Sequence, residues 1–273
     1  MGMTSDIGRI SVEQRRHWNR HGYLLIEQAL SPAEVASLLG AIDAVLASKR
    51  DRDFVSQGSA ASKIVQAVSE TEALDPLTDH PSVFPILLAL LGPWLQILGS
   101  EIFVRKPAAA REPLVPWHTD GGPTLGAFLP RRGNPVLQMK AQFFLTDVSG
   151  VDSGNFLFVP GSHRTAPPPD LGARKAPRGA VQLRAHAGDV LLFPWSLWHA
   201  VAPNHSRRIR KSVTLRYGQL WSRPYDYERL PDHVLGRMTP RRRRLFGDNG
   251  PNADPVSYFY PNEEEHLRLM RGE

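Results

Sequence analysis

The chain has 273 residues, of which 41% are hydrophobic and 22% charged, as in an ordinary globular protein. Because it contains no cysteine, disulfides, thiolate metal sites and a cysteine nucleophile are excluded, and any metal must be held by imidazole and carboxylate groups. The net charge of +6 would suit a nucleic acid, but the run from Arg241 to Arg244 lies in no recognisable binding module and is expected to be a solvated helix face. We therefore expect a small-molecule substrate, for which an anionic group would explain the charge, rather than a nucleic acid.

The N-terminal residues lack the apolar core of a signal peptide. The longest apolar run, residues 86–98, is interrupted by Gly92 and Pro93 and is too short to span a membrane. These two observations predict a soluble, cytoplasmic protein.

Residues 1–98 are expected to be mainly helical. Residues 23–26 form a short apolar run that suits a buried strand. A helix is predicted over residues 31–47, because Ser31 can cap it, Pro32 fits its first turn and Glu34 completes a capping box. A second helix over residues 82–91 would end at the Gly-Pro pair that follows it.

From residue 99 the pattern changes to short apolar segments between turns rich in Gly and Pro, which is typical of a β-sandwich or barrel. We expect the barrel over residues 99–220 and a C-terminal extension over 221–273, within a single domain, 1–273. Residues 121–134 and 164–179 lack periodicity and are predicted to be functional loops. The predicted strands cover residues 101–105, 136–146, 156–159, 180–185, 189–193, 197–202 and 209–220.

The segment Trp117-His118-Thr119-Asp120 carries the first candidate metal ligands. Residues two apart on a strand point to the same face, so His118 and Asp120 can reach one ion. Such a short pattern also arises by chance, in which case the histidine would be an ordinary surface residue. A further ligand elsewhere in the chain is needed to decide between these readings.

His199 is the candidate third ligand, because it follows the buried segment 188–193 on the next predicted strand. A lone histidine there is more often a core residue than a ligand. Two histidines and one carboxylate, however, form the facial triad of non-heme Fe(II) oxygenases, which leaves positions open for a co-substrate and O₂. His186 and His205 lie at turns and are weaker rivals for the third position.

Arg210 is the candidate co-substrate residue. We predict a hairpin that joins residues 197–202 to residues 209–217, which would place Arg210 directly opposite His199. Alternation puts Ser212 on the same strand face as Arg210. A guanidinium grips a carboxylate bidentately and the serine hydroxyl can add a hydrogen bond, so this pair would bind the distal carboxylate of 2-oxoglutarate.

Further polar residues share strand faces. Gln138, Lys140 and Gln142 alternate with apolar residues. That face is either the barrel interior, where it would line the co-substrate site, or the solvated exterior, and the pattern does not choose between them. Lys106 is a further candidate of this kind.

Substrate contacts are expected from the two long loops and from the segment after residue 219. The charged candidates there are Arg131, Arg132, Arg174 and Arg216.

The motifs stand in an ordered series along most of the chain, and the series resembles the phytanoyl-CoA dioxygenase family of Fe(II)- and 2-oxoglutarate-dependent oxygenases. The usual acidic-Asn-Gly turn is replaced here by Asp152-Ser153-Gly154-Asn155, which we expect to alter a turn rather than the chemistry. The likeness is carried by Gly22-Tyr23, the capped helix from Ser31, Lys106-Pro107, Trp117 to Asp120, Leu145-Thr146-Asp147, Pro160-Gly161-Ser162-His163-Arg164, residues 188–199, Asn204, Ser206 and Arg210.

The resemblance implies a mainly β protein, a double-stranded β-helix (a jelly-roll, cupin-like barrel) with N-terminal helices packed outside it. It implies that His118, Asp120 and His199 hold catalytic Fe(II) and that Arg210 and Ser212 bind 2-oxoglutarate. The expected reaction is hydroxylation, or a related oxidation, of an unactivated C–H bond of a small molecule by O₂, with release of succinate and CO₂. Halogenation is disfavoured because the metal carboxylate, Asp120, is present.

Three other functions fit parts of the sequence. A nucleic-acid-directed oxygenase would use the basic residues and bind oligonucleotides in a salt-dependent manner. A zinc hydrolase can use two histidines and an aspartate, but it would need no O₂ and form no succinate. A non-catalytic barrel that binds a ligand would show neither turnover nor a metal requirement. The oligomeric state and the identity of the substrate are not predicted.

Overall fold

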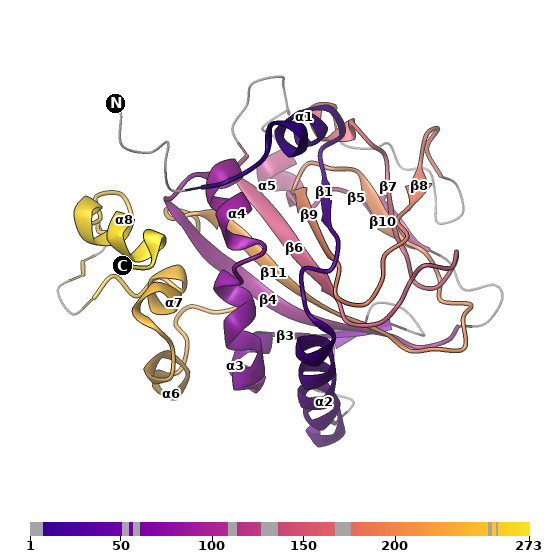
Figure 1. The fold of residues 1–273 in the computed structure, drawn as a ribbon, viewed down its shortest axis with the longest axis horizontal. Helices are drawn as coiled ribbons and strands as arrows, with labels where there is room; N and C mark the ends of the chain where they lie inside the picture. The colour runs from indigo at the N-terminus through magenta and orange to yellow at the C-terminus, as the bar shows by residue number, and fades with distance from the viewer. Residues whose placement is uncertain are drawn as a thin grey trace.

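The computed structural model describes residues 8–50, 55–56, 61–108, 114–126, 136–166, 176–250, 253–254 and 256–273. Its strands form two antiparallel sheets (Figure 1). The seven-stranded sheet has the order β1 (Leu24–Ile26), β9 (Val190–Pro194), β6 (Gln138–Phe144), β11 (Arg210–Gln219), β4 (Leu95–Arg105), β3 (Ala61–Val65) and β2 (Val55–Ser56). The four-stranded sheet has the order β5 (Val115–His118), β10 (His199–Val201), β7 (Phe156–Phe158) and β8 (Val181–Gln182).

Both helices predicted in the N-terminal part are present, at Pro32–Ser48 and Phe84–Leu91. Helix α2 (Pro32–Ser48) opens with the expected capping box, in which the Glu34 N–H donates to Ser31 Oγ at 3.3 Å and the Ser31 N–H donates to Glu34 Oε2 at 2.7 Å. The other helices among the described residues of this part are α1 (Val12–His21), α3 (Ala67–Glu70), the 3₁₀ helix η2 (Glu72–Asp79) and α4 (Phe84–Leu91).

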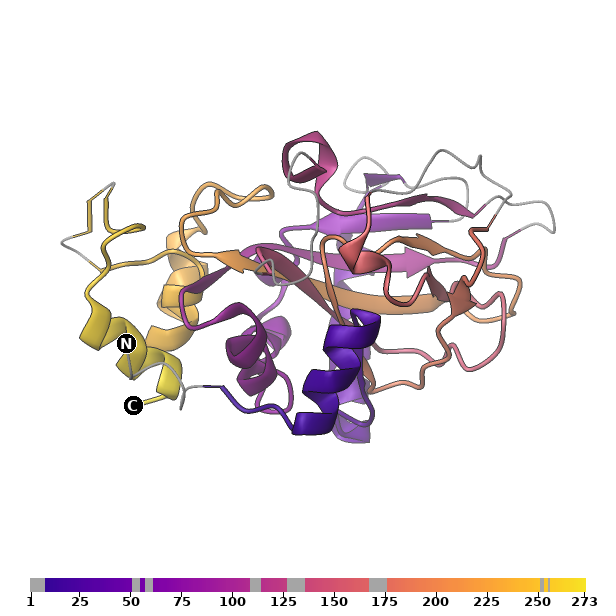
Figure 2. The ribbon, with the colours of Figure 1, turned by 90° about the horizontal axis from the view of Figure 1, so that it is seen from above.

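Alternation along the strands of the larger sheet separates an apolar outer face from a polar inner face. Val213, Leu215 and Tyr217 of β11 are fully buried, and they share one hydrophobic core with Ile42 of α2 and Leu87 of α4. The helices therefore cover the outer face of this sheet, and helices α1 and α4 both lie on one side of it (Figure 2). The other face turns its polar side chains towards the space beside the four-stranded sheet.

The described part of residues 221–273 forms three helices at the end of the molecule opposite β7, β8 and β10 (Figure 1). They contribute Leu245 and Met270, among others, to the core of the larger sheet. These helices are α6 (Asp232–Gly236), α7 (Pro240–Leu245) and α8 (Glu263–Arg271). No helix within the described ranges combines the length and apolarity that a membrane crossing requires.

The arginine run does lie on a helix, α7, but the prediction of a solvated face is wrong. Arg241 and Arg242 both pair with Asp79, at 3.3 and 2.7 Å. Arg244 is 3% exposed and lies 3.3 Å from Glu265. Arg241 and Arg242 thus attach α7 to the N-terminal part, and Arg244 attaches it to α8, so their charge no longer argues for a nucleic-acid partner.

The predicted hairpin between residues 197–202 and 209–217 is wrong. Strand β10 pairs with β5 and β7 in the smaller sheet, whereas β11 pairs with β4 and β6 in the larger sheet. The turn after residue 202 therefore carries the chain from one sheet to the other. His199 and Arg210 are not neighbours on a ladder; they enter the interior from different sheets.

Other element predictions need smaller corrections. Strands β2 and β3 were not predicted, and β4 begins six residues before the expected position 101. Residues 180–185 form a strand only at 181–182, and residues 136–137 lie outside β6. Part of the predicted loop 121–134 is the short helix α5 (Gly122–Gly126). The predicted contacts Arg131, Arg132 and Arg174 lie outside the described residues.

Candidate metal and co-substrate site

His118 and His199 come together because their strands are neighbours. His118 is the last residue of β5, His199 is the first residue of β10, and the two are direct partners in the antiparallel register. Just after β5, the Asp120 N–H donates to the Trp195 carbonyl at 2.8 Å, which turns the carboxylate back towards the two imidazoles. Ligand atoms of His118, Asp120 and His199 all lie within 4.8 Å of one another.

Both imidazoles present Nε2 as a lone-pair donor. Nδ1 of His118 lies 2.7 Å from the Pro116 carbonyl, and Nδ1 of His199 lies 2.9 Å from the Leu197 carbonyl. A carbonyl oxygen only accepts, so each Nδ1 carries the proton and each Nε2 is free to bind a metal. Burial lowers the pKa of His199 to about 3, which keeps its ring in the neutral form that metals require.

The two carboxylate oxygens of Asp120 differ, because one accepts hydrogen bonds and the other does not. Its Oδ1 accepts from Lys140 Nζ at 2.6 Å and lies 3.5 Å from Arg216 Nη2. Oδ2 is buried, has no hydrogen-bond partner, and lies 3.5 Å from His199 Nε2. Burial alone would raise the pKa of Asp120, but the charges of Lys140 and Arg216 help to lower it, so the group is a carboxylate.

This donor set fits a divalent cation. Ligands about 2.1 Å from one ion and at right angles to each other lie roughly 3 Å apart, close to the spacing of Oδ2 and Nε2. An unpaired buried carboxylate oxygen that faces two imidazole lone pairs is also costly unless a cation lies among them. The three side chains occupy one side of that position, so the other side stays open.

The Pro-Gly-Ser-His segment supports the strand that carries His199. Ser162 Oγ accepts from the Trp198 N–H at 2.9 Å, and Ser196 Oγ donates to the His163 carbonyl at 2.9 Å. The rings of Phe156 and Phe193 both lie 5.2 Å from the His199 ring, between centroids. The motif thus has a structural role, and aromatic rings keep water away from this ligand.

A cavity of about 240 Å³ extends from the three ligands between the two sheets. Charged and polar side chains line much of it, while Phe156, Phe193, Val115 and Val201 give it apolar walls. The charged and polar lining residues are Lys63, Glu101, Arg105, His118, Asp120, Lys140, Gln142, His199, Arg210, Thr214 and Arg216.

Arg210 lies in this cavity, six residues along the inner face of β11 from Arg216. It is 4% exposed, and its Nε has no hydrogen-bond partner. Burial, together with the neighbouring charge of Arg105, lowers the pKa of Arg210 to about 9. Among the described residues no carboxylate pairs with this guanidinium, so it is suited to an anion from solution.

Gly154 makes room for the two arginines. Its φ of +76° favours glycine, and an added Cβ would lie 3.0 Å from Arg105 Cδ and 3.6 Å from Arg210 Cδ. The departure from the usual turn sequence therefore keeps a glycine where the arginine side chains pass.

The other co-substrate candidates lie in different places. Lys140 and Gln142 line the cavity, so their strand face is the interior one. Ser212 is fully buried on the same face as Arg210, and its hydroxyl accepts from Gln142 Nε2 at 3.2 Å, but it is not among the lining residues. Gln138 is half-buried at the start of β6 and does not line the cavity, and Lys106 is exposed beyond the end of β4.

Sequence reasoning missed Lys63, Glu101 and Arg105. Lys63 and Glu101 form an ion pair across the β3–β4 ladder, and Arg105 is the direct partner of Arg210 across β4 and β11. For β4 a signal was present, because the charged Glu101 and Arg105 fall on one strand face while the apolar residues 102 and 104 fall on the other. For Lys63 there was none, since β3 was not predicted.

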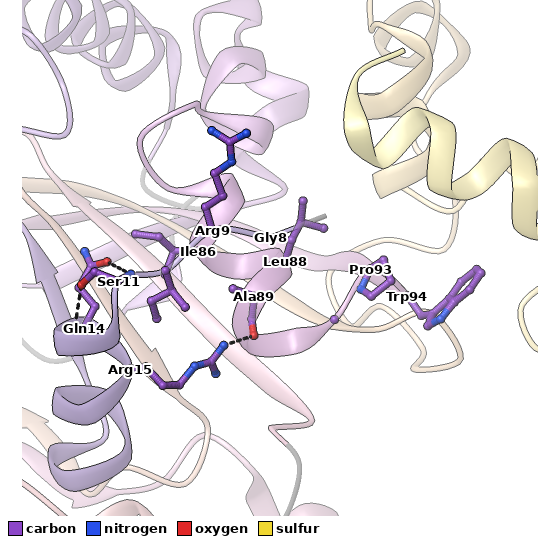
Figure 3. A pocket seen from close by; sticks show the side chains of 12 residues that line it. Gly8, Arg9, Ser11, Gln14, Arg15, Ile86, Leu88, Ala89, Pro93 and Trp94 are labelled. Carbon is purple, nitrogen blue, oxygen red and sulfur yellow. Dashed lines mark hydrogen bonds between the residues drawn. The ribbon is translucent and has the colours of Figure 1, made fainter. Parts of the chain in front are cut away.

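A larger hollow lies away from this site, between the N-terminal segment and α4 (Figure 3). Its volume is about 990 Å³, and Arg15 crosses it to donate to the Ala89 carbonyl at 2.7 Å. The residues that line it include no histidine, aspartate or glutamate. The smaller cavity is therefore the candidate site, because it holds the convergent ligands. The rival histidines His186 and His205 are exposed and lie outside the cluster.

The sequence profile described as "Phytanoyl-CoA dioxygenase (PhyH)" matches residues 18–212. The dioxygenase cdmA of Talaromyces verruculosus is 28% identical over 190 residues, which are 66% of this chain and 60% of that protein. An ectoine dioxygenase of Bordetella bronchiseptica is 24% identical over 267 residues, which cover 84% of this chain and 83% of that protein.

Solved structures share the fold. HygX from Streptomyces hygroscopicus, crystallised with nickel and 2-oxoglutarate, superposes with a TM-score of 0.68 at 16% identity, covering 80% of this chain and 90% of HygX. The 2-oxoglutarate-dependent epimerase SnoN from nogalamycin biosynthesis has a TM-score of 0.59 at 25% identity, covering 75% of this chain and 79% of SnoN. These similarities confirm the double-stranded β-helix. The chain belongs to the phytanoyl-CoA dioxygenase family of Fe(II)- and 2-oxoglutarate-dependent oxygenases.

Proposed function

We propose that this protein oxidises a C–H bond of a small molecule, with His118, Asp120 and His199 as the Fe(II) ligands and Arg210 as the anchor for 2-oxoglutarate. The observation that carries the proposal is the cavity itself. At one place it has two imidazole lone pairs and an unpartnered carboxylate oxygen, and further along the same cavity it has a buried guanidinium.

Bound Fe(II), with 2-oxoglutarate and O₂, would supply the oxidising chemistry, with succinate and CO₂ as products. The protein residues provide the rest. The three ligands leave one side of the metal position open. Phe156 and Phe193 exclude water around His199. Trp195 fills the space beside Gly121, where an added Cβ would lie 2.4 Å from the indole, and so fixes the start of the loop that follows Asp120.

Arg210 would bind the carboxylate of 2-oxoglutarate that does not react. Its guanidinium is buried, so a bidentate contact with a carboxylate would be little screened by solvent. Ser212 holds Gln142, which does line the cavity, so we place Ser212 behind the co-substrate position rather than in contact with it. Lys106 and Gln138 do not line the cavity, so we propose no co-substrate role for them.

The substrate is proposed to carry an anionic group that meets Arg216. The cavity lining holds five basic side chains but only two carboxylates, one of which is the metal ligand Asp120. Arg216 makes only long contacts to Asp120, at 3.4 and 3.5 Å, and its Nε is buried without a partner. A small molecule also agrees with the names of similar proteins, which include an ectoine dioxygenase and HygX solved with hygromycin B bound.

Turnover tests the reaction class. Protein loaded with Fe(II) under O₂ should convert 2-oxoglutarate to succinate, faster when a substrate from a metabolite panel is added. His199→Ala should abolish succinate formation, whereas His205→Ala, which changes an exposed histidine outside the cluster, should not. O₂-independent turnover supported by zinc, without succinate, would replace the proposal by a hydrolase. No turnover and no metal requirement would indicate a binding module.

The anionic substrate class has a separate test. Among panel compounds that stimulate succinate release, carboxylic acids should act at lower concentration than their amides, and Arg216→Leu should remove most of this difference. Equal stimulation by acids and amides in the unaltered protein would rule out the anionic group while leaving the reaction class intact.

A further inference from the structure

Lys140 is a buried lysine on the polar inner face of the larger sheet. It lies in the middle of β6 between Phe193 of β9 and Arg216 of β11 in the register, and its side chain is 11% exposed. Burial lowers its pKa, and the nearby charge of Asp120 opposes that effect. A buried ion pair is rarely worth more than well-packed apolar residues of the same volume, so a role beyond stability is indicated.

The close polar contact of Lys140 is with the carboxylate of Asp120. Its ammonium donates to Asp120 Oδ1 at 2.6 Å and lies 5.9 Å from the centroid of the Phe193 ring, whose position is fixed beside His199. Arg216 reaches the same oxygen only at 3.5 Å. Lys140 is therefore the close partner of Oδ1, while Oδ2 keeps no partner and faces His199.

We infer that Lys140 is a positioning residue for the metal ligand Asp120: by holding Oδ1, it presents Oδ2 alone to the ion and keeps the carboxylate from rotating or binding through both oxygens. The inference rests on the metal site proposed above. Hydrogen-bond partners of ligating carboxylates generally set their orientation, and their loss costs about 10–100-fold in metal affinity.

The direction in which metal affinity changes when Lys140 is removed distinguishes a positioning role from a purely electrostatic one. A lysine that acted only as one more cation near a divalent ion would repel it, so its removal would tighten metal binding. Removal of a positioning lysine would instead weaken metal binding, because the carboxylate would lose its fixed orientation and metal binding would have to restore it. Metal affinity therefore distinguishes the two roles without any turnover.

The experiment measures Co(II) binding to the full-length, metal-free protein by calorimetry, together with the visible absorption of the bound Co(II), for Lys140→Met, Lys140→Gln and Lys140→Arg. Lys211→Met is the matched control, because Lys211 also pairs with a carboxylate, Asp43, and is 14% exposed, but points to the outer face of the sheet. Circular dichroism and thermal unfolding in a chelator show which variants are folded.

Lys140→Met should bind Co(II) about 10–100-fold more weakly and shift its absorption. Lys140→Gln, which can still donate one hydrogen bond, should lie between it and the unaltered protein and carries the test if Lys140→Met does not fold. Lys140→Arg should restore affinity to within a few-fold, and Lys211→Met should change nothing. Unchanged or tighter binding with an unchanged spectrum in the folded Met or Gln variant would overturn the inference. If His199→Ala also leaves Co(II) binding unchanged, the metal site itself is wrong, so the two failures are distinguishable.

Discussion

Replacing Arg210 should raise the stability of the ligand-free protein and weaken its binding of 2-oxoglutarate. Arg210→Met keeps most of the side-chain length but removes a guanidinium that is 4% exposed and has no carboxylate partner within the described chain. Burial and the neighbouring Arg105 lower the pKa of Arg210 from 12.5 to about 9. Since one pKa unit corresponds to about 1.4 kcal/mol, keeping this group charged costs a few kcal/mol in the ligand-free protein. We therefore expect the variant to unfold at a higher temperature than the unaltered protein when no dicarboxylate is present.

Binding of 2-oxoglutarate should change in the other direction. Loss of one partner of a buried charged hydrogen-bond pair costs about 3–5 kcal/mol, which is roughly 10²–10⁴-fold in affinity. Calorimetry on Ni(II)-loaded protein measures this affinity without turnover, and thermal unfolding with and without 2-oxoglutarate gives the stability. Arg208→Met, which removes an exposed arginine two residues earlier, is the control. A variant with unaltered affinity for 2-oxoglutarate, or one less stable than the unaltered protein without ligand, would refute the reasoning.

Three further predictions concern His199, Gly154 and Asp226, a carboxylate outside the cavity lining that accepts from the Ser100 N–H at 2.7 Å. His199→Ala should reduce Co(II) affinity at least 100-fold, measured by calorimetry, and a smaller loss would mean that His199 is not a ligand. Gly154→Ala should lower the free energy of unfolding by about 1–2 kcal/mol, because φ is +76°, and weaken 2-oxoglutarate binding, because the new Cβ would lie 3.0 Å from Arg105 Cδ; wild-type stability in urea would contradict this. Asp226 has a pKa raised by burial to about 6, so its stabilising contribution is complete below about pH 4 and is lost as the pH rises through 6. Asp226→Asn should therefore flatten the fall in unfolding free energy between pH 4 and 6 by roughly 1–2 kcal/mol, and an unchanged slope in urea titrations at several pH values would exclude the effect.

The residues of the site differ in how far the sequence alone could place them. His118 and Asp120 were predicted as a pair from the two-residue period of a strand. In the structure β5 ends at His118, and the hydrogen bond from the Asp120 N–H to the Trp195 carbonyl turns the carboxylate towards the imidazoles. The interior face of β11 followed from the same alternation. The hairpin between His199 and Arg210 was wrong, because equal spacing from a turn does not reveal that the chain changes sheet there. The single-domain organisation and the ligand roles of the site residues remain predictions.

Other parts of the site had weaker or no local signals. Lys63 lies on β3, in the part of the chain that was expected to be mainly helical, and its pairing with Glu101 depends on the ladder between β3 and β4. For Lys140 the sequence left two faces open, and only the packing of helices against the opposite face decided that it points inward.

The sequence by itself determined local features: the capped helix at Ser31, the closeness of His118 and Asp120 along the chain, and the alternation that puts Arg210 and Arg216 on one strand face. Each of these depends on backbone geometry over a few residues. Only the tertiary structure decided which strands became neighbours, that Lys140 donates to Asp120, and that the arginines of α7 are ion-paired. Those outcomes depend on contacts between residues far apart in the chain, whose free energies are shared among many groups and leave no pattern in any short segment.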